Sequence, residues 1–280
     1  MADRRRLAAN VGGRGRVLNL VPIPDRPTFD SPDPRWRVRL TDDGSPTLVT
    51  AADGQAMHSG CGAVAETRHV YLRGGNVERR LEQGSPTRVL EVGFGSGLGW
   101  LLTADLAVAT GTPLFYMALE LDPPPAAVIR QLDLRRYVND EALVDEFCDW
   151  LDRAGPPASG ACNDQAELTF RFGPATLSLV IGDALRWCEQ RTGESPEVTG
   201  EPFDSIYFDP YSPEVAPSLW RTEVFQTLRG QLRPSGRLVT YCVSRTVRDG
   251  LSAAGFRVSR VTGPPGGKRE VLIAFNQPEE

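Results

Sequence analysis

The sequence has no long apolar segment and few cysteines. No uninterrupted apolar run approaches the ~20 residues that a transmembrane helix needs, which excludes an integral membrane protein. The cysteines are odd in number and scattered, without a C-x-x-C pair, at Cys61, Cys148, Cys162, Cys188 and Cys242. This pattern argues against a disulfide framework and against a zinc centre. We therefore expect a reduced, cytoplasmic protein with no metal site.

Lysine is almost absent, because only Lys268 among the 31 basic residues is a lysine. A GC-rich genome that favours arginine codons accounts for this bias. The net charge of −5 gives no global attraction for a polyanion, although a local basic patch can still bind one. The start of the chain, Met1 to Arg6, is basic but is not followed by an apolar core, so it is not a secretory signal.

The order of patterns along the chain predicts three parts. Residues 1–34 are rich in Arg, Gly, Pro and Asp without periodicity and are expected to form a flexible lead-in. Residues 35–80 are expected to form a small N-terminal subdomain with a hairpin, strands 36–40 and 47–50, followed by a helix over 62–72. Residues 81–280 alternate strands and helices, which indicates an α/β domain with a mostly parallel sheet.

The strands of this α/β domain predict its architecture. Apolar runs at 88–92, 114–120, 168–172, 176–181, 203–208 and 237–241 precede a final pair, 256–261 and 270–275, that is expected to be an antiparallel hairpin at the sheet edge. A seven-stranded, mostly parallel sheet with an antiparallel last strand is the Rossmann-like fold of class I methyltransferases. Four strands end in an acid, at Glu91, Glu120, Asp183 and Asp209. Ligands of open α/β sheets bind outside the carboxyl ends of strands, so these acids should converge on one crevice.

The most informative motif is the glycine-rich loop that follows the first strand of this domain. It reads Glu91-Val92-Gly93-Phe94-Gly95-Ser96-Gly97-Leu98-Gly99, with a glycine at every second position. A dinucleotide loop has the pattern G-x-G-x-x-G, but the position of its third glycine is occupied here by Leu98. The spacing therefore favours S-adenosylmethionine as the cofactor over a dinucleotide, while glycines that serve only a tight turn are the alternative.

The chemistry of S-adenosylmethionine suggests a role for each acid. Glu120 can accept both ribose hydroxyls, because a carboxylate offers several lone pairs. Asp183, followed by Ala184, is placed to accept from the adenine amino group, and Glu91 or Asp209 can meet the ammonium end of the methionine. The predicted cofactor-binding set is Glu91, Gly93, Phe94, Gly95, Gly97, Glu120, Asp183 and Ala184.

A second motif, Asp209-Pro210-Tyr211, resembles the D/N-P-P-Y/F loop of amine methyltransferases, in which a backbone carbonyl and the acid accept hydrogen bonds from the target nitrogen. An alkylamine has a pKa of about 10, by analogy with lysine, and its ammonium form has no lone pair with which to attack a methyl group. Asp209 is expected to orient the amine and accept its proton, and Tyr211 to stack on a planar base. An Asp-Pro turn at a strand end is the structural alternative.

Longer segments resemble the bacterial tRNA 5-methylaminomethyl-2-thiouridine methyltransferases, which comprise the stand-alone MnmD type and the methyltransferase half of bifunctional MnmC. The resemblance covers about residues 36–276. It includes the opening "DGS-TL" and "HS-GA-E-HV" segments within residues 43–71, the loop at 90–99, the "DAIYLDPFSP" and "LW" segments within 204–220, and the "L-P-G-L-TY" and "PG-GGKREML" segments within 232–272. Gly99 stands where the family usually has asparagine, and Tyr211 where it has phenylalanine.

The resemblance implies S-adenosylmethionine-dependent methylation of the aminomethyl group on the wobble uridine of tRNA. A separate flavin-dependent oxidase is then expected to act upstream. His58, Ser59 and Glu66 lie in the opening motif and are candidates for substrate binding, although Glu66 can equally cap or brace the site. Lys268 and Arg269, in a glycine-rich hairpin, are candidates for a local basic patch that contacts tRNA phosphates.

Two other classes of function remain open at this point. The same fold serves small-molecule amine methyltransferases and aminopropyltransferases that use the decarboxylated cofactor, and an acidic chain suits such substrates. A cofactor-binding or RNA-binding module without catalysis is the third possibility.

Overall fold

The computed structural model describes residues 26–52, 54–155, 165–192 and 200–277. Most of the expected lead-in, residues 1–25, lies outside this part. The remainder of the lead-in is not all extended coil, because β1 (Thr28–Asp30) pairs antiparallel with β2 (Trp36–Leu40). The predicted hairpin is confirmed: β2 pairs with β3 (Pro46–Thr50), and the small sheet has the order β1-β2-β3.

A helical segment links this small sheet to the main domain. The predicted helix at 62–72 is present as α1 (Ala63–Glu66), which continues directly into the π-helix η1 (Thr67–Arg73). The short helix α2 (Val77–Glu82) then leads to β4 (Thr87–Val92). Trp36, Val38 and Leu48 of the small sheet are buried in the same apolar cluster as residues of α3 (Leu98–Thr110) and β5 (Leu114–Glu120), so this sheet packs on the domain.

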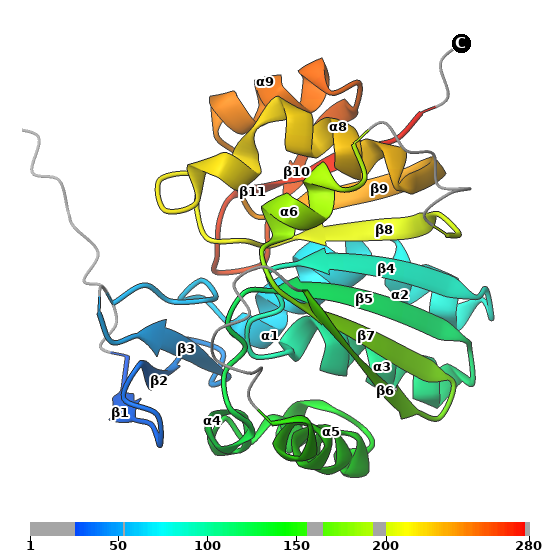
Figure 1. The fold of residues 1–280 in the computed structure, drawn as a ribbon. Coiled ribbons are helices and arrows are strands. Elements are labelled where there is room, and N and C mark those ends of the chain that lie inside the picture. Colours follow the sequence, from blue (N-terminus) through cyan, green and yellow to red (C-terminus); the bar gives the residue numbers. More distant parts are fainter. Residues whose placement is uncertain (1–25, 53, 156–164, 193–199, 278–280) are drawn as a thin grey trace, which may run out of the picture.

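The main sheet has eight strands in the order β10-β11-β9-β8-β4-β5-β7-β6 (Figure 1). Its strands are β4, β5 (Leu114–Glu120), β6 (Ala166–Phe172), β7 (Ala175–Ile181), β8 (Phe203–Phe208), β9 (Leu232–Thr240), β10 (Arg257–Thr262) and β11 (Glu270–Phe275). The expected count of seven was wrong by one. The residues around Gly173 and Pro174 form a hairpin that adds β6 antiparallel to β7.

The predicted orientation of the last strand is confirmed, since β11 runs antiparallel to β9 and pairs with β10 as a hairpin. β4 pairs in parallel with β5 on one side and with β8 on the other. The chain thus leaves β4 first toward β5 and β7 and later returns to β8 on its other side. This reversal creates the crevice in which open α/β sheets bind ligands, at the carboxyl ends of β4 and β8.

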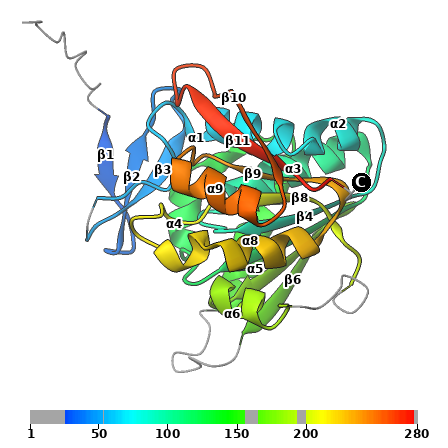
Figure 2. The same ribbon diagram turned by 90° about the horizontal axis from the view of Figure 1, so that it is seen from above.

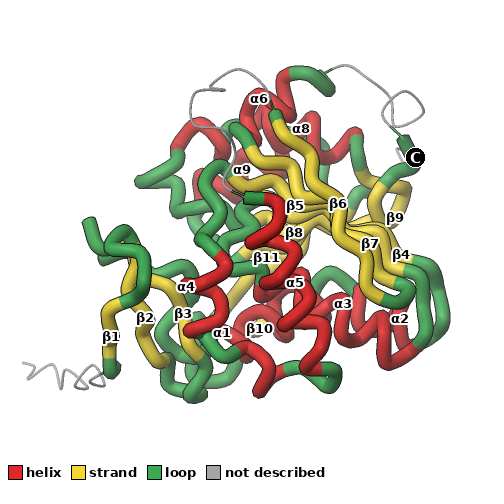
Figure 3. The backbone as a smooth tube through the Cα atoms, turned by 60° about the horizontal axis from the view of Figure 1, so that its bottom comes forward, coloured by secondary structure: helices red, strands yellow, loops and turns green. Residues whose placement is uncertain are grey.

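Helices cover both faces of the sheet (Figures 2 and 3). One apolar cluster includes side chains of η1, α2, α3 (Leu98–Thr110), α4 (Ala126–Gln131), η2 (Leu134–Tyr137) and α5 (Glu141–Ala154). The other includes side chains of α6 (Ala184–Glu189), η3 (Pro217–Trp220), α8 (Thr222–Gly230) and α9 (Arg245–Ala253). None of the helices in the described ranges combines the length and the apolar composition needed to span a bilayer.

Candidate active site

One cavity of about 990 Å³ opens at the carboxyl ends of the central strands. All four strand-end acids, Glu91, Glu120, Asp183 and Asp209, line it, so the predicted convergence is confirmed. Nine of the other predicted site residues line it as well: His58, Ser59, Glu66, Gly93, Phe94, Gly95, Ala184, Tyr211 and Lys268. Gly97 and Arg269 are not among its lining residues.

The glycine loop between β4 and α3 has a backbone that side chains disfavour. Gly93, Gly95 and Gly97 have φ values of 90°, 56° and 77°. A Cβ on Gly93 would lie 2.5 Å from the carbonyl oxygen of Asp209, so the loop contacts the Asp-Pro-Tyr turn directly. Gly97 serves packing, because a Cβ there would lie 2.9 Å from the Phe94 ring.

Glu91 is buried beneath this loop. A Cβ on Gly99 would lie 2.4 Å from its Oε1 and 2.9 Å from the Tyr116 hydroxyl, so the glycine that replaces the family asparagine makes room for both groups. Burial raises the pKa of Glu91 well above its usual value, and the Tyr116 hydroxyl opposes that shift. Its Oε2 is buried without a hydrogen-bond partner among the described residues, as expected for a carboxylate that binds a polar group of a ligand.

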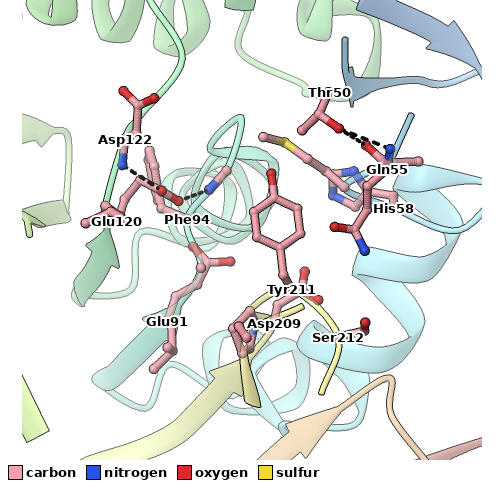
Figure 4. Close-up of a pocket in the computed structure, with 18 of the residues that line it drawn as sticks. Thr50, Gln55, His58, Glu91, Phe94, Glu120, Asp122, Asp209, Tyr211 and Ser212 are labelled. Atoms are coloured by element: carbon pink, nitrogen blue, oxygen red, sulfur yellow. Dashed lines mark hydrogen bonds between the residues drawn. The ribbon is translucent and has the colours of Figure 1, made fainter. Parts of the chain in front are cut away.

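Glu120, at the end of β5, is held by the backbone on both oxygens. Gly95 N–H donates to Oε2 at 2.8 Å and Asp122 N–H donates to Oε1 at 3.0 Å (Figure 4). Burial raises the pKa of Glu120, and the hydrogen bonds from the backbone N–H groups of Asp122 and Gly95 oppose the shift. Each oxygen keeps a lone pair, so the fixed carboxylate can accept a pair of hydroxyls.

Asp183 and Ala184 follow β7. Asp183 is the N-cap of α6, and its Oδ1 accepts a hydrogen bond from Leu185 N–H at 2.8 Å. Capping therefore uses one lone pair of the carboxylate that the sequence assigns to the adenine amino group, and the other lone pairs stay available.

Asp209, directly after β8, lies among charged and hydroxyl groups from three other segments. Burial is the main cause that raises the pKa of Asp209 well above its usual value, and the charge of Glu66 adds to this shift. The Tyr71 hydroxyl and the positive charge of Lys268 act in the opposite direction. A carboxylate with a raised pKa is a stronger base, as proton abstraction from an ammonium requires.

The rest of the turn presents an aromatic ring to the cavity. Tyr211 is 37% exposed and lies between the wall that carries Phe94 and the wall that carries His58 (Figure 4). Its carbonyl oxygen accepts a hydrogen bond from Trp220 Nε1 at 2.8 Å. The carbonyl oxygen of Pro210 accepts one from the Tyr241 hydroxyl at 3.0 Å.

The "DGS" segment of the opening motif has a structural role. The first backbone N–H groups of α1 are bonded by side chains of the preceding turn: Thr41 Oγ1 accepts from Ala63 at 3.3 Å, Ser45 Oγ from Val64 at 3.1 Å, and Asp43 Oδ2 from Ala65 at 3.1 Å. These bonds supply the cap that Gly62 lacks. They fix α1, and with it Glu66.

The "HS-GA-E" segment builds the wall opposite the glycine loop. Ser59 N–H donates to Glu66 Oε2 at 2.7 Å. His58 Nδ1 lies 2.9 Å from Thr47 Oγ1, and burial lowers the pKa of His58, which favours the neutral imidazole. His69 bonds the Thr262 carbonyl oxygen through Nε2 at 2.8 Å and does not line the cavity, so it holds η1 to β10.

The structure adds residues that the sequence did not indicate. The cavity is also lined by Trp36, Thr50, Gln55 and Met57 of the N-terminal part and by Tyr71 and Tyr241. A Cβ on Gly95 would lie 3.2 Å from Met57 Sδ, so the small sheet and its loop form a wall of the cavity. Tyr71 and Tyr241 stand inside the resembling segments, but periodicity explains them as helix and strand residues.

These features match those of known proteins. A family model described as S-adenosyl-L-methionine-dependent methyltransferase matches residues 151–277. The match lies in the C-terminal part of the chain, which is thus similar to this family. The description of this family model agrees with the expected methyl donor, S-adenosylmethionine. Glu91 with its unpartnered Oε2 and Glu120 with its fixed oxygens fit such a donor.

The names of the curated relatives agree with the resemblance seen in the motifs. The tRNA 5-methylaminomethyl-2-thiouridine biosynthesis bifunctional protein MnmC of Delftia acidovorans is 30% identical over 237 residues, 84% of this chain and 34% of that protein. The protein of the same name from Pseudomonas syringae pv. tomato is 32% identical over 213 residues, 74% of this chain and 30% of that protein. The resemblance inferred from the motifs is thus confirmed. The chain spans about a third of the length of these curated relatives.

A solved structure confirms the predicted fold class. MNMC2 from Aquifex aeolicus aligns with a TM-score of 0.63 at 20% identity, covering 88% of this chain and 72% of that one.

Proposed function

We propose that this chain transfers a methyl group from S-adenosylmethionine to the primary amine of an aminomethyl group on the wobble uridine of tRNA. One observation carries the proposal: the glycine loop contacts the Asp-Pro-Tyr turn, because a Cβ on Gly93 would lie 2.5 Å from the Asp209 carbonyl oxygen. A donor held by the loop and an amine held at the turn would therefore be neighbours. The names of the relatives supply the tRNA substrate.

We assign the donor side to Glu91, Glu120, the glycine loop and the Asp183-Ala184 segment, which line one part of the cavity. Glu120 would accept the ribose hydroxyls and Glu91 the ammonium of the methionine. When bound there, S-adenosylmethionine supplies an electrophilic methyl group on a sulfonium. Gly97 contributes by letting the loop turn into α3 at a φ of 77°.

We assign the acceptor side to Asp209 and Tyr211, with His58, Ser59 and Glu66 on the opposite wall. The ammonium must lose a proton before its nitrogen can attack, and the Asp209 carboxylate would accept that proton. The raised pKa of Asp209 brings it closer to that of the amine, which lowers the free energy of the transfer. Tyr211 would stack on the uracil ring.

The rim of the cavity and the N-terminal part of the chain have roles in this proposal as well. Lys268 and Arg269, both exposed in the loop between β10 and β11, would contact tRNA phosphates at the rim of the cavity. A separate flavin-dependent oxidase would act upstream in the cytoplasm. Residues 35–80 would act as a subdomain that completes the cavity of the domain formed by residues 81–280.

The test is a transfer assay with purified protein and methyl-labelled S-adenosylmethionine. The acceptor is tRNA that carries 5-aminomethyl-2-thiouridine, and fully modified tRNA is the control. Label in 5-methylaminomethyl-2-thiouridine, identified by mass spectrometry of nucleosides, is the expected result. Label only in polyamines would support a small-molecule transferase instead, and donor binding without any transfer would support a binding module.

A further inference from the structure

The two backbone carbonyl groups that follow Asp209 are both bonded by aromatic side chains of other elements. The Tyr241 hydroxyl, one residue beyond β9, donates to Pro210 O at 3.0 Å, and Trp220 Nε1, in η3, donates to Tyr211 O at 2.8 Å. The Tyr241 and Trp220 rings pack edge to face, with centroids 6.0 Å apart and an interplanar angle of 81°. The turn is therefore held by a pair of donors that support one another.

Lys268 covers the outer side of this arrangement. Its Nζ lies 4.0 Å from the centroid of the Tyr241 ring, a distance typical of a cation–π interaction. The loop that carries Lys268 is closed by hydrogen bonds from Gly263 N–H to Arg269 O at 2.9 Å and from Gly267 N–H to Pro264 O at 3.0 Å. The only lysine of the chain thus connects the β10–β11 hairpin to the Asp-Pro-Tyr turn through Tyr241.

We propose that Tyr241 is a positioning residue for methyl transfer, and that Lys268 fixes its ring so that the Pro210 carbonyl and the Asp209 carboxylate keep one orientation. The proposal rests on the proposed function. It modifies the expectation that a backbone carbonyl and the acid both accept from the target nitrogen. Tyr241 uses one of the two lone pairs of the Pro210 carbonyl oxygen from within the protein, so the Asp209 carboxylate offers more acceptor sites to the substrate nitrogen than this carbonyl does.

The electrostatics support this arrangement. Burial raises the pKa of Tyr241, so its hydroxyl stays protonated and donates at neutral pH. The positive charge of Lys268 lowers the pKa of Asp209 against the larger effect of burial, which favours the ionised carboxylate that accepts a proton. Glu66 of α1, Tyr71 of η1 and Lys268 of the hairpin loop act on Asp209. The charge of Asp209 also acts on Glu91, Tyr116 and Tyr241.

The chain offers a matched control for the hydroxyl of Tyr241. Tyr137, in η2, donates to the Gly44 carbonyl oxygen at 3.0 Å, the same kind of bond at the same length, and does not line the cavity. Tyr241→Phe and Tyr137→Phe each remove one hydroxyl and keep the ring. Tyr241→Phe should lower kcat on the tRNA substrate by about 3- to 10-fold, as expected for the loss of one hydrogen bond, and leave the KM for S-adenosylmethionine unchanged. Tyr137→Phe should leave both constants unchanged.

Hydrogen exchange gives a readout that needs no activity. Amides of residues 209–220 should exchange faster in Tyr241→Phe than in the wild type or in Tyr137→Phe. Equal kcat, or equal exchange over these residues, in the two variants would overturn the proposal. A wild type that transfers no methyl group to tRNA would refute the proposed function, while the exchange result would still decide whether Tyr241 positions the turn.

Substitutions of Lys268 separate its charge from the packing of its stem. Lys268→Met should move the acid limb of the kcat–pH profile to higher pH, because the positive charge that lowers the pKa of Asp209 is lost. Lys268→Arg should restore the profile, since a guanidinium also stacks on an aromatic ring. An acid limb at the same pH in both variants would contradict the assigned role of Lys268.

Discussion

Gly93 and Asp209 are in van der Waals contact through their backbones: a Cβ on Gly93 would lie 2.5 Å from the carbonyl oxygen of Asp209. The residues are far apart in the sequence, but they follow two strands, β4 and β8, that pair in parallel. The contact brings the loop assigned to the methyl donor against the turn assigned to the amine.

We predict that Gly93→Ala abolishes this contact and lowers transfer activity by at least 10-fold. The alanine would be strained at a φ of 90°, at a cost of about 1–2 kcal/mol, and its methyl group would also displace the Asp209 carbonyl. Gly84→Ala is the matched control, because Gly84 has a φ of 69° and open space around its Cβ. Chemical denaturation and methyl-transfer assays of both variants measure the two effects. Equal losses of activity would show that only backbone strain matters.

Asp209→Asn should lower kcat by about 10²- to 10⁴-fold, because the amide cannot accept the proton of the ammonium. Donor binding, measured by isothermal titration calorimetry, should stay close to that of the wild type. Retention of most of the turnover by a folded Asp209→Asn protein would refute the assigned role.

The same substitution should alter the pH dependence of stability. The pKa of Asp209 is raised in the folded protein, so the folded state holds this proton more tightly than the unfolded state. Its contribution to stability is present below the unfolded pKa of about 4 and is lost as the pH rises toward the folded value. The free energy of unfolding of Asp209→Asn should therefore increase relative to the wild type between pH 4 and neutral pH. Urea titrations at several pH values test this, and a parallel pH dependence would contradict it.

Glu120→Gln should weaken S-adenosylmethionine binding by about 10-fold or more, since an amide has one acceptor oxygen for the two ribose hydroxyls. The loop should also shift, because Gly95 N–H donates to Glu120 Oε2 at 2.8 Å. Glu141→Gln, an exposed residue in the first turn of α5, is the control and should bind the donor normally. Calorimetry compares the two dissociation constants, and equal values would exclude Glu120 from the donor site.

Asp204→Ala should unfold more easily without a change in donor affinity. The Asp204 side chain, 2% exposed at the start of β8, contacts Arg80 at 2.8 Å and Arg233 at 2.9 Å, and accepts from Arg88 N–H at 2.8 Å. Removing one partner of a buried ionic network costs about 3 kcal/mol. Asp204 does not line the cavity. A lower midpoint in urea with an unchanged dissociation constant for S-adenosylmethionine is expected, and an unchanged midpoint would disprove the structural role.

The sequence was most informative where one short segment determines both the backbone conformation and the functional groups of the site. The loop from Glu91 to Gly99 and the Asp209-Pro210-Tyr211 turn could be read directly, because their glycines, proline and acids impose local geometry. All eight apolar runs in the sequence form strands of the main sheet. The count of seven came from the fold class and omitted β6, an additional edge strand antiparallel to β7. Gly97 and Arg269 belong to the predicted motifs, but the structure does not place them in the cavity wall.

The sequence alone therefore determined the fold class, the glycine loop and the position of the acid at the turn, because each depends on residues that are neighbours along the chain. Only the tertiary structure decided that Met57 and Trp36 of the N-terminal part line the cavity, that Tyr241 donates to the Asp-Pro-Tyr turn, and that Lys268 reaches Tyr241 from the β10–β11 hairpin. Those contacts join residues separated by tens of positions. Strand order and helix packing bring these residues together, and no local pattern of polarity or spacing in the sequence predicts such contacts.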